Sequence, residues 1–174
     1  MEGNYFDIET YSPGNKPNSK TDKIISIQFQ KIDIKTGKIL GNLQILKEWE
    51  SSEEKIVKEI HKWFFSRPWQ FIPIGFNLIF EWEFLQEKFK LYNLEIKNLD
   101  YFFKYPQIDL KSYAVMKKGG FFGASLSSIS NKKDNGNVIK EYYENKEYNK
   151  IEEYIIDEAK SFIECYSELI EKLK

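Results

Sequence analysis

Residues 5–10 read Tyr-Phe-Asp-Ile-Glu-Thr and place two carboxylates, Asp7 and Glu9, two positions apart in an apolar run. Side chains alternate between the faces of an extended strand, so both acids project from one face and Phe6 and Ile8 from the other. Carboxylates held side by side lose hydration and repel each other unless a shared proton, a basic partner or a cation compensates. A divalent cation is the strongest candidate, because oxygen-rich sites suit Mg²⁺ or Mn²⁺. The alternative is an edge strand with two solvated acids.

The composition limits the classes of protein to which the chain can belong. Its 174 residues are enough for a full hydrophobic core, and we predict a single domain over residues 1–174. A net charge of −1 excludes the strongly basic surface of a high-affinity, non-specific nucleic-acid binder, although it leaves room for a local basic rim around an acidic pocket. One histidine and one cysteine exclude a zinc cluster and an internal disulfide and argue against a catalytic triad. The chain has neither an apolar run of membrane-spanning length nor a secretion signal, so we expect a cytoplasmic protein with no membrane partner.

Hydrophobic periodicity predicts an α/β fold with a mixed five-stranded sheet flanked by helices. The first three strands are expected to be antiparallel, and strand-helix alternation then adds βα units. Residues 23–33 alternate as a half-buried strand does, and residues 117–123 have the composition of a glycine-containing loop. Trp63 and Leu173 are expected on the apolar faces of the first and last helix. The predicted strands are 5–10, 23–33, 39–46, 71–75 and 107–110, and the predicted helices follow Ser51-Ser52, cover 78–91 and close the chain over 150–174.

A third carboxylate, Glu81, is predicted at the start of a helix that follows a short buried strand. Such a junction directs an acid over the carboxyl edge of the sheet, where Asp7 and Glu9 are also expected, and the amino end of a helix favours negative charge. The alternative is that Glu81 interacts only with the helix dipole, a role that suits the neighbouring Glu83 better. Asn77 precedes the same helix and is expected to cap it rather than to contact a substrate.

The last predicted helix carries a phenol and a carboxylate on one face. Tyr154 and Glu158 are four positions apart, which brings their side chains together on a helix, and Asp157 lies one position away from Glu158. Charged residues on an exposed helix are usually solvated, so this pair by itself indicates little. Asp109 ends a predicted strand near the same sheet edge, where it either supports the site or has a structural role.

In their order and spacing, these acids resemble the three motifs of the DEDD-type 3′-5′ exonucleases, which belong to the ribonuclease-H-like superfamily. The third motif has a tyrosine and no histidine near it, so it resembles the DEDDy branch rather than the DEDDh branch. Residues 107–110 and Ser125-Leu126 also resemble the group that includes the proofreading domains of family B DNA polymerases, and the resemblance covers almost the whole chain. The three matching segments are Phe6-Asp7-Ile8-Glu9-Thr10, Asn77-x-x-Phe80-Glu81-x-x-Phe84-Leu85 and Tyr154-x-x-x-Glu158-Ala159.

This resemblance implies a metal-dependent 3′-5′ exonuclease that cleaves single-stranded DNA or RNA at its 3′ end by a two-metal mechanism. Asp7 is expected to bridge the two ions, and Tyr154 is expected to orient the attacking water. The expected ligands of two Mg²⁺ or Mn²⁺ ions are Asp7, Glu9, Glu81 and either Glu158 or Asp157. The expected substrate contacts are the motif residues Thr10, Asn77 and Phe80 together with Lys117 and Lys118.

Two departures from the family pattern keep other functions open. Glu81 and Glu158 stand where the motifs usually have aspartate, and the extra methylene shifts the oxygens of a site that tolerates little error in ligand distance. The alternative is therefore a catalytically impaired ribonuclease-H-like module that binds nucleic acid or a partner protein. A structural subunit unrelated to nucleic acid ranks last, because it would leave the paired acids Asp7 and Glu9 without a purpose.

The segment after the fifth predicted strand offers a basic and aromatic surface. Lys117 and Lys118 precede two glycines and the rings of Phe121 and Phe122, which suits phosphate contacts next to stacked bases. The alternative is a solvated loop whose phenylalanines fill the core. Because no polymerase or helicase sequence accompanies the motifs, any replication or repair partner is expected to be a separate protein.

Overall fold

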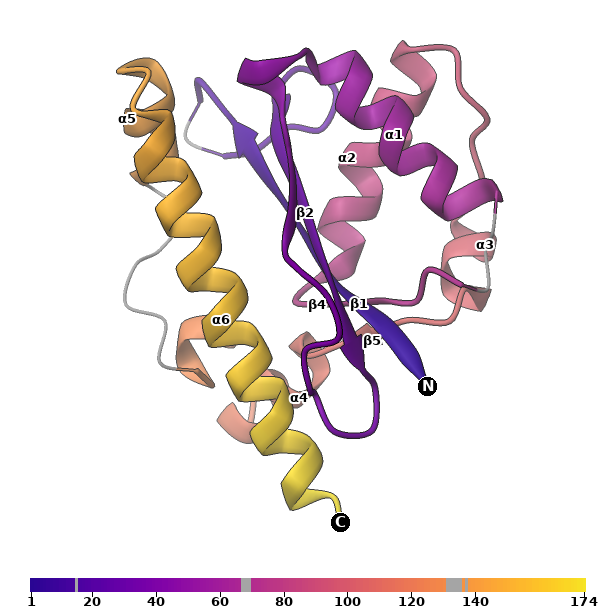
Figure 1. The fold of residues 1–174 in the computed structure, drawn as a ribbon, viewed down its shortest axis with the longest axis vertical. Coiled ribbons are helices and arrows are strands. Elements are labelled where there is room, and N and C mark those ends of the chain that lie inside the picture. The colour runs from indigo at the N-terminus through magenta and orange to yellow at the C-terminus, as the bar shows by residue number, and fades with distance from the viewer. Residues whose placement is uncertain (15, 67–69, 131–135, 137) are drawn as a thin grey trace.

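The computed structural model describes residues 1–14, 16–66, 70–130, 136 and 138–174, and Figure 1 shows its sheet between two sets of helices. The strands are β1 (Glu2–Tyr11), β2 (Lys23–Asp33), β3 (Gln44–Lys47), β4 (Pro73–Gly75) and β5 (Ile108–Asp109). The helices are α1 (Glu53–Ser66), α2 (Leu78–Leu91), α3 (Leu99–Lys104), α4 (Lys111–Lys118), α5 (Val138–Glu144) and α6 (Tyr148–Lys172), with short 3₁₀ turns η1 (Glu48–Glu50) and η2 (Leu126–Ser128). None of the helices described is both long and apolar enough to cross a membrane.

The five strands form one mixed sheet in the order β3-β2-β1-β4-β5. β1 and β2 pair antiparallel over their length, from Glu2 opposite Asp33 to Tyr11 opposite Lys23, and β3 pairs antiparallel with β2. β4 pairs parallel with β1, and β5 pairs parallel with β4. This arrangement confirms the predicted α/β fold, in which three antiparallel strands are followed by βα units.

The central strand β1 separates two of the three apolar clusters formed by the residues described. Phe6 and Ile8 pack on the side of α1 and α2, as the alternation of the sequence predicts. Tyr5 points to the other side, where its ring lies 5.0 Å from that of Phe162 on α6. Asp7 and Glu9 share the face of Tyr5, so the strand directs both carboxylates toward α6. Two helical layers therefore cover the sheet (Figure 1), and the face of β1 that carries the acids is the one that packs against α6.

β2 differs from the half-buried strand that its alternation predicts. Ser26 and Gln28, two of the three polar members of the alternating run 25–30, are fully buried, whereas the third, Gln30, is half-buried. The cause is tertiary, because β2 lies between β1 and β3 and helices cover both faces of the sheet. Alternation in this strand therefore separates an apolar core from a buried polar surface rather than from solvent.

The third strand is shorter than the predicted segment 39–46. β3 begins only at Gln44, and Ile39 forms an isolated bridge with Ile32. The turn before it explains the difference, since the Asp33 carboxylate accepts hydrogen bonds from the Lys35 N–H and the Thr36 hydroxyl. These bonds close a tight turn, and the ladder resumes only when the chain has passed Gly41 and Asn42.

Three helices, α3, α4 and α5, lie outside the sequence prediction. α4 extends to Lys118, although residues 117–123 are predicted to form a loop, so Lys117 and Lys118 belong to its last turn. The Asp109 carboxylate accepts a hydrogen bond from the Lys111 N–H at the start of α4, and Gly119 ends the helix in the left-handed conformation with φ +71°. These two local signals bound a helix whose weak apolar pattern hides it in the sequence.

The apolar faces of the first and last helix are also less complete than predicted. α6 begins at Tyr148, two residues before the predicted start, and Leu173 is 74% exposed at its end, where the helix extends beyond the sheet (Figure 1). Trp63 of α1 is 45% exposed, although its ring lies 5.4 Å from that of Phe29. The indole therefore covers the margin of the core instead of filling it.

Candidate metal centre

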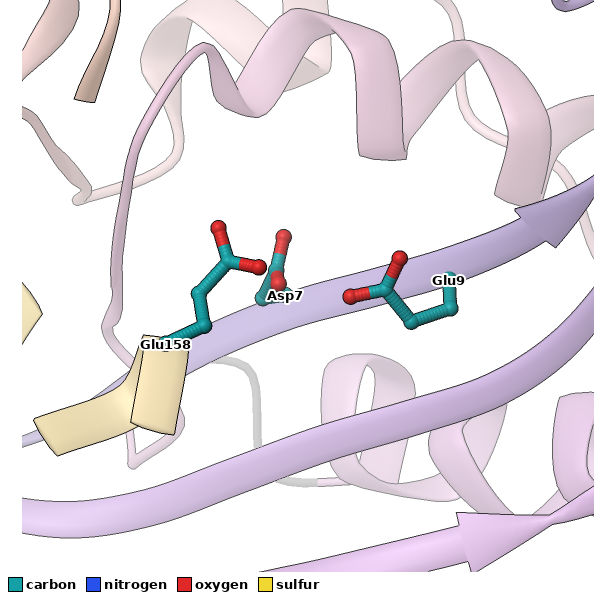
Figure 2. Close-up of side chains that lie close together, drawn as sticks. All are labelled: Asp7, Glu9 and Glu158. Carbon is teal, nitrogen blue, oxygen red and sulfur yellow. The ribbon is translucent and has the colours of Figure 1, made fainter. Parts of the chain in front are cut away.

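Three carboxylates converge between β1 and α6. Asp7, Glu9 and Glu158 each place one oxygen so that the three oxygens lie within 4.8 Å of one another. Figure 2 shows Glu158 reaching from α6 toward Asp7 and Glu9 on β1, with all three carboxylates directed into the same space. Residues separated by most of the chain thus form one acidic cluster.

The sheet is irregular at the position of Glu9. Glu9 pairs with Ser26, but Thr10 pairs with Ile24, so Ile25 has no partner in the ladder. Such a β-bulge increases the local twist and reorients the side chains next to it, and bulges are frequent beside active sites. Thr10 is half-buried and lies on the far side of the bulge from the cluster.

A buried amide on β2 holds both acids of the first motif. Gln28 lies opposite Asp7 in the ladder, and its Nε2 donates to Asp7 Oδ2 at 2.9 Å and to Glu9 Oε1 at 3.5 Å. The Ser26 hydroxyl in turn donates to Gln28 Oε1 at 3.1 Å, which fixes the orientation of the amide. Sequence reasoning missed Gln28 as a site residue, because its role follows from the register of β1 against β2.

Two tyrosines line the cluster as donors. Burial, followed by the charges of Glu9 and Glu158, raises the pKa of Tyr154, so the phenol keeps its proton at neutral pH. Tyr5 is fully buried beside Asp7 and donates its hydroxyl to Asp7 Oδ2 at 3.4 Å. Burial and the Asp7 charge raise the pKa of Tyr5 as well. Both phenols can donate hydrogen bonds, and neither is suited to act as a base.

Glu81 lies next to the cluster but is not one of its three closely grouped acids. It is only 4% exposed, and burial, followed by the negative charges of Asp7 and Asp109, raises the pKa of its carboxyl well above the usual range. Its Oε2 is buried and has no hydrogen-bond partner among the residues described. An unsatisfied buried carboxylate oxygen facing other acids is costly unless a proton or a cation compensates it.

The close approach of β4 to β1 brings Glu81 to this position. A Cβ atom on Gly75 would lie 2.7 Å from the Phe6 carbonyl oxygen and 2.5 Å from Leu78 Cδ2, so only glycine fits between the strand and the start of α2. The turn that follows places Glu81 in the first turn of α2 beside Asp7. The close packing at Gly75 therefore brings the second motif next to the first.

The N-terminus of α2 is capped by Asp109 and not by Asn77. Asn77 has a left-handed backbone with φ 67°, and its side chain makes no capping hydrogen bond, so the expected cap is wrong. Asp109 instead accepts hydrogen bonds from the N–H groups of Asn77 at 2.8 Å and Leu78 at 2.9 Å. Because it also accepts from the Lys111 N–H, Asp109 joins the starts of α2 and α4 and has a structural role.

The remaining candidate residues are not members of the group of three acids. Asp157 is exposed on α6, whereas Glu158 reaches the cluster, and Glu83 is exposed on α2. Phe80 is half-buried, with its ring 4.8 Å from that of Phe84. The exposed Lys117 and Lys118 end α4.

The residues present fit a divalent cation. The donors are carboxylate oxygens, which hard cations such as Mg²⁺ and Mn²⁺ prefer, and no nitrogen or sulfur ligand is in the group. The unsatisfied Oε2 of Glu81 offers a further oxygen beside Asp7. The arrangement can therefore hold metal between β1, α2 and α6, with Gln28, Tyr5 and Tyr154 as hydrogen-bond donors around it.

Comparisons with known proteins agree with this geometry at the level of the fold. No protein-family model and no curated protein matches the chain. Among solved structures, it is similar to the family B DNA polymerase from the hyperthermophilic archaeon Pyrobaculum calidifontis, with a TM-score of 0.73 and 14% identity over 98% of this chain and 24% of the polymerase. It is also similar to exonuclease I in its apo form, with a TM-score of 0.51 and 13% identity over 68% of this chain and 32% of that one. A metal-free complex of E. coli exonuclease I with single-stranded DNA gives a TM-score of 0.51 and 11% identity over 67% and 30%.

These neighbours define the class of fold. The chain shares its α/β fold with part of a family B DNA polymerase and with part of exonuclease I, in agreement with the resemblance of its motifs. It spans about a quarter to a third of the length of the chains that it matches. At such low identities the likeness concerns the fold alone.

Proposed function

We propose that this protein is a metal-dependent 3′-5′ exonuclease that hydrolyses phosphodiester bonds at the 3′ end of single-stranded nucleic acid. One observation carries the proposal: the acids of three separate sequence motifs meet beneath α6 in a nuclease fold. Asp7 and Glu9 come from the first motif, Glu81 from the second and Glu158 from the third. Four adjoining carboxylates repel one another, and a bound divalent cation would compensate that repulsion.

The proposed metal ligands are Asp7, Glu9, Glu81 and Glu158. Together they would hold two ions of Mg²⁺ or Mn²⁺. Bound cations of this kind lower the pKa of water and neutralise charge on the phosphate and on the leaving oxygen. Gln28 keeps Asp7 and Glu9 facing the same space by donating to both. Tyr154, whose pKa burial and the charges of Glu9 and Glu158 raise, would orient the attacking water through its hydroxyl.

For the third motif, we assign the ligand role to Glu158 and not to Asp157. Both lie on α6, but only the Glu158 carboxylate reaches Asp7 and Glu9, while Asp157 is exposed. The longer glutamate side chain spans the space between the helix and the strand, which offers a reason for its presence where related motifs have aspartate.

The proposed substrate is a single-stranded 3′ end, in DNA or RNA. One solved neighbour is exonuclease I bound to single-stranded DNA, and another is exonuclease I bound to the C-terminus of SSB. By extension, we propose that a separate protein of replication or repair presents the strand. Thr10, Asn77 and Phe80 flank the acids in sequence and are the proposed contacts near the cleaved bond, with Lys117 and Lys118 as phosphate contacts farther along.

The test compares neighbouring acids on α6. Glu158→Gln should lower the rate of mononucleotide release from a 5′-labelled single strand by at least roughly 100-fold, since even outer partners of a metal ligand typically contribute 10–100-fold. Asp157→Asn is the matched control and should retain activity. Asp7→Ala and chelation should abolish the activity. Full activity in Asp7→Ala, or equal effects at 157 and 158, would contradict the proposed site.

A second candidate function is a silent module that binds nucleic acid without cleaving it. The observation in its favour is the position of Glu81 outside the group of three closely placed acids. Titration with Mn²⁺ separates the two functions, because a metal-dependent nuclease must show a rise in melting temperature with Mn²⁺. Binding of single strands without a Mn²⁺ effect would favour the silent module.

A further inference from the structure

Residues 119–123, between α4 and η2, form a loop that we name the diphenylalanine loop. Phe121 is 69% exposed and Phe122 is 97% exposed, so the alternative in which these rings fill the core is wrong. Their ring centroids lie 6.4 Å apart with the planes at 81°. Gly119 precedes the pair and Gly123 follows it, both in left-handed backbone conformations with φ +71° and +74°, which residues other than glycine rarely adopt. The backbone itself therefore presents the two rings to solvent.

The base of the loop is held beside the acid-bearing edge of the sheet. Lys111 Nζ donates to the Ala124 carbonyl at 2.7 Å and lies 5.0 Å from the Phe121 ring centroid and 5.3 Å from that of Phe76. Phe76 directly precedes Asn77 at the junction that leads into α2 and Glu81. Lys111 is thus a cation between two aromatic rings and ties the loop to the second motif.

The far end of the loop is anchored as well. Ala124, Leu126 and Ile129 are buried in the core beneath α6, and Cys165 Sγ donates to the Ile129 carbonyl at 3.3 Å. Phe122 remains outside this packing. Both ends of the loop are therefore anchored, and the two rings are exposed on an anchored segment.

The surface around the rings is cationic. Lys117 and Lys118 are exposed in the last turn of α4, immediately before the loop, and neither has a carboxylate within ion-pairing distance among the residues described. Several other lysines of the helices are paired with glutamate or aspartate, as Lys58, Lys62 and Lys104 are. Exposed rings next to unpaired ammonium groups match a polyanion that carries flat bases.

We propose that the diphenylalanine loop is a base-stacking site for the single strand whose 3′ end enters the acid cluster. This inference rests on the proposed function and names the part of the enzyme that holds the strand away from the cleaved bond. Phe122 provides the main stacking surface, Phe121 positions it through its contact with Lys111, and Lys117 and Lys118 contact the phosphates. Stacking accepts every base because each has an aromatic face, so the site selects single strands and not a sequence.

Binding without cleavage tests the loop directly. The anisotropy of a fluorescent oligothymidylate of about 12 nucleotides is measured in EDTA, so that hydrolysis does not interfere. Phe122→Ala should weaken binding about tenfold, as expected for the loss of one stacked base, whereas Phe122→Trp should retain it. Phe103→Ala is the matched control, because Phe103 is also 69% exposed but lies on α3 and packs against Phe102. It should bind like the wild type.

A second probe separates stacking from charge. For an abasic strand of the same length, Phe122→Ala should have no effect, whereas Lys117→Ala with Lys118→Ala should weaken binding to both strands and reduce its salt dependence. Equal binding of wild type and Phe122→Ala to the oligothymidylate would overturn the proposal. So would a Phe122-dependent affinity for anionic vesicles or for a protein, without one for single strands.

The result also distinguishes the loop from the nuclease proposal. Phe122-dependent binding with no phosphodiester hydrolysis in Mn²⁺ would support the loop and refute the exonuclease. Hydrolysis with an unchanged KM in Phe122→Ala would support the exonuclease and refute the loop. If both proposals hold, Phe122→Ala should raise KM about tenfold on single strands with little change in kcat, because the stacked base is remote from the reacting bond.

Discussion

Glu53 and Glu81 are both buried carboxylates in the first turn of a helix, yet their surroundings are opposite. Glu53 Oε1 accepts from the Ile24 N–H at 2.7 Å and lies 3.2 Å from Lys88 Nζ, and its Oε2 accepts from the Tyr92 hydroxyl at 2.7 Å. Glu81 faces Asp7, and one of its oxygens has no hydrogen-bond partner among the residues described. The protein itself compensates the charge of Glu53.

The difference distinguishes a structural acid from an acid kept for a ligand. A buried carboxylate is stable when hydrogen bonds and an opposite charge replace its hydration, as at Glu53. At Glu81 the burial remains, but its neighbours are other acids and its Oε2 has no hydrogen-bond partner among the residues described, and the pKa of Glu81 rises. Unfavourable electrostatics of this kind are typical of functional sites, where a bound cation supplies the missing charge.

The largest expected effect comes from breaking the compensated site. Lys88→Met should lower the free energy of unfolding by about 3–5 kcal/mol, because it leaves the Glu53 charge buried without its cation. Urea denaturation measures the change. Lys90→Met is the control, since Lys90 is exposed on the same helix in a pair with Glu87, and its effect should stay within roughly 0.5 kcal/mol. Similar values for the two variants would show that Lys88 does not compensate Glu53.

An intermediate effect is expected at Gln28, which donates to two acids of the candidate metal centre. Gln28→Leu should lower the free energy of unfolding by about 1–3 kcal/mol, because Asp7 and Glu9 lose a buried amide from which both accept. It should also weaken Mn²⁺ binding in calorimetry, since the two carboxylates are no longer held together. Gln30→Leu is the matched variant on the same strand, where the amide donates to the Gly41 carbonyl and not, among the residues described, to the acids. Unchanged Mn²⁺ affinity in Gln28→Leu would limit Gln28 to a structural role.

The smallest effect has the opposite sign. Glu81→Gln should raise the free energy of unfolding of the metal-free protein by roughly 0.5–2 kcal/mol, because it removes a carboxyl that burial and Asp7 disfavour in its charged form. The same variant should show a smaller rise in melting temperature with Mn²⁺ than the wild type does.

The exposed Glu83→Gln, on the same helix, is the control for Glu81→Gln and should change neither quantity. Destabilisation of the metal-free protein by Glu81→Gln would remove the contrast between Glu81 and Glu53. An unchanged response to Mn²⁺ would remove Glu81 from the proposed ligands.

Local pattern was sufficient for much of the fold. The alternation around Asp7 predicted that both acids share one face of β1, and the helical length and composition of residues 78–91 predicted α2 with its observed bounds. Both features depend on neighbours within a few positions, so backbone geometry determines them. The prediction failed where partners are distant: Ser26 and Gln28 were expected at a half-exposed surface and are buried beneath helices.

The candidate site shows the same division. The sequence could not choose between Asp157 and Glu158, which differ by one position on a helix, and it assigned the cap of α2 to Asn77 although Asp109 provides it. Each of these details depends on the rotation of one element against another. Packing of apolar faces sets that rotation, and no local pattern records it.

By itself, the sequence determined that Asp7 and Glu9 share a face, that Tyr154 and Glu158 share another, and that the chain alternates as a mixed α/β sheet requires. Only the tertiary structure decided that these faces meet, that Gln28 joins the two acids, that Glu81 is buried without full compensation and that Phe122 is exposed. The physical reason is one of range. Backbone periodicity acts over one or two turns, whereas the convergence of charges from β1, α2 and α6 depends on how two apolar cores pack against the sheet.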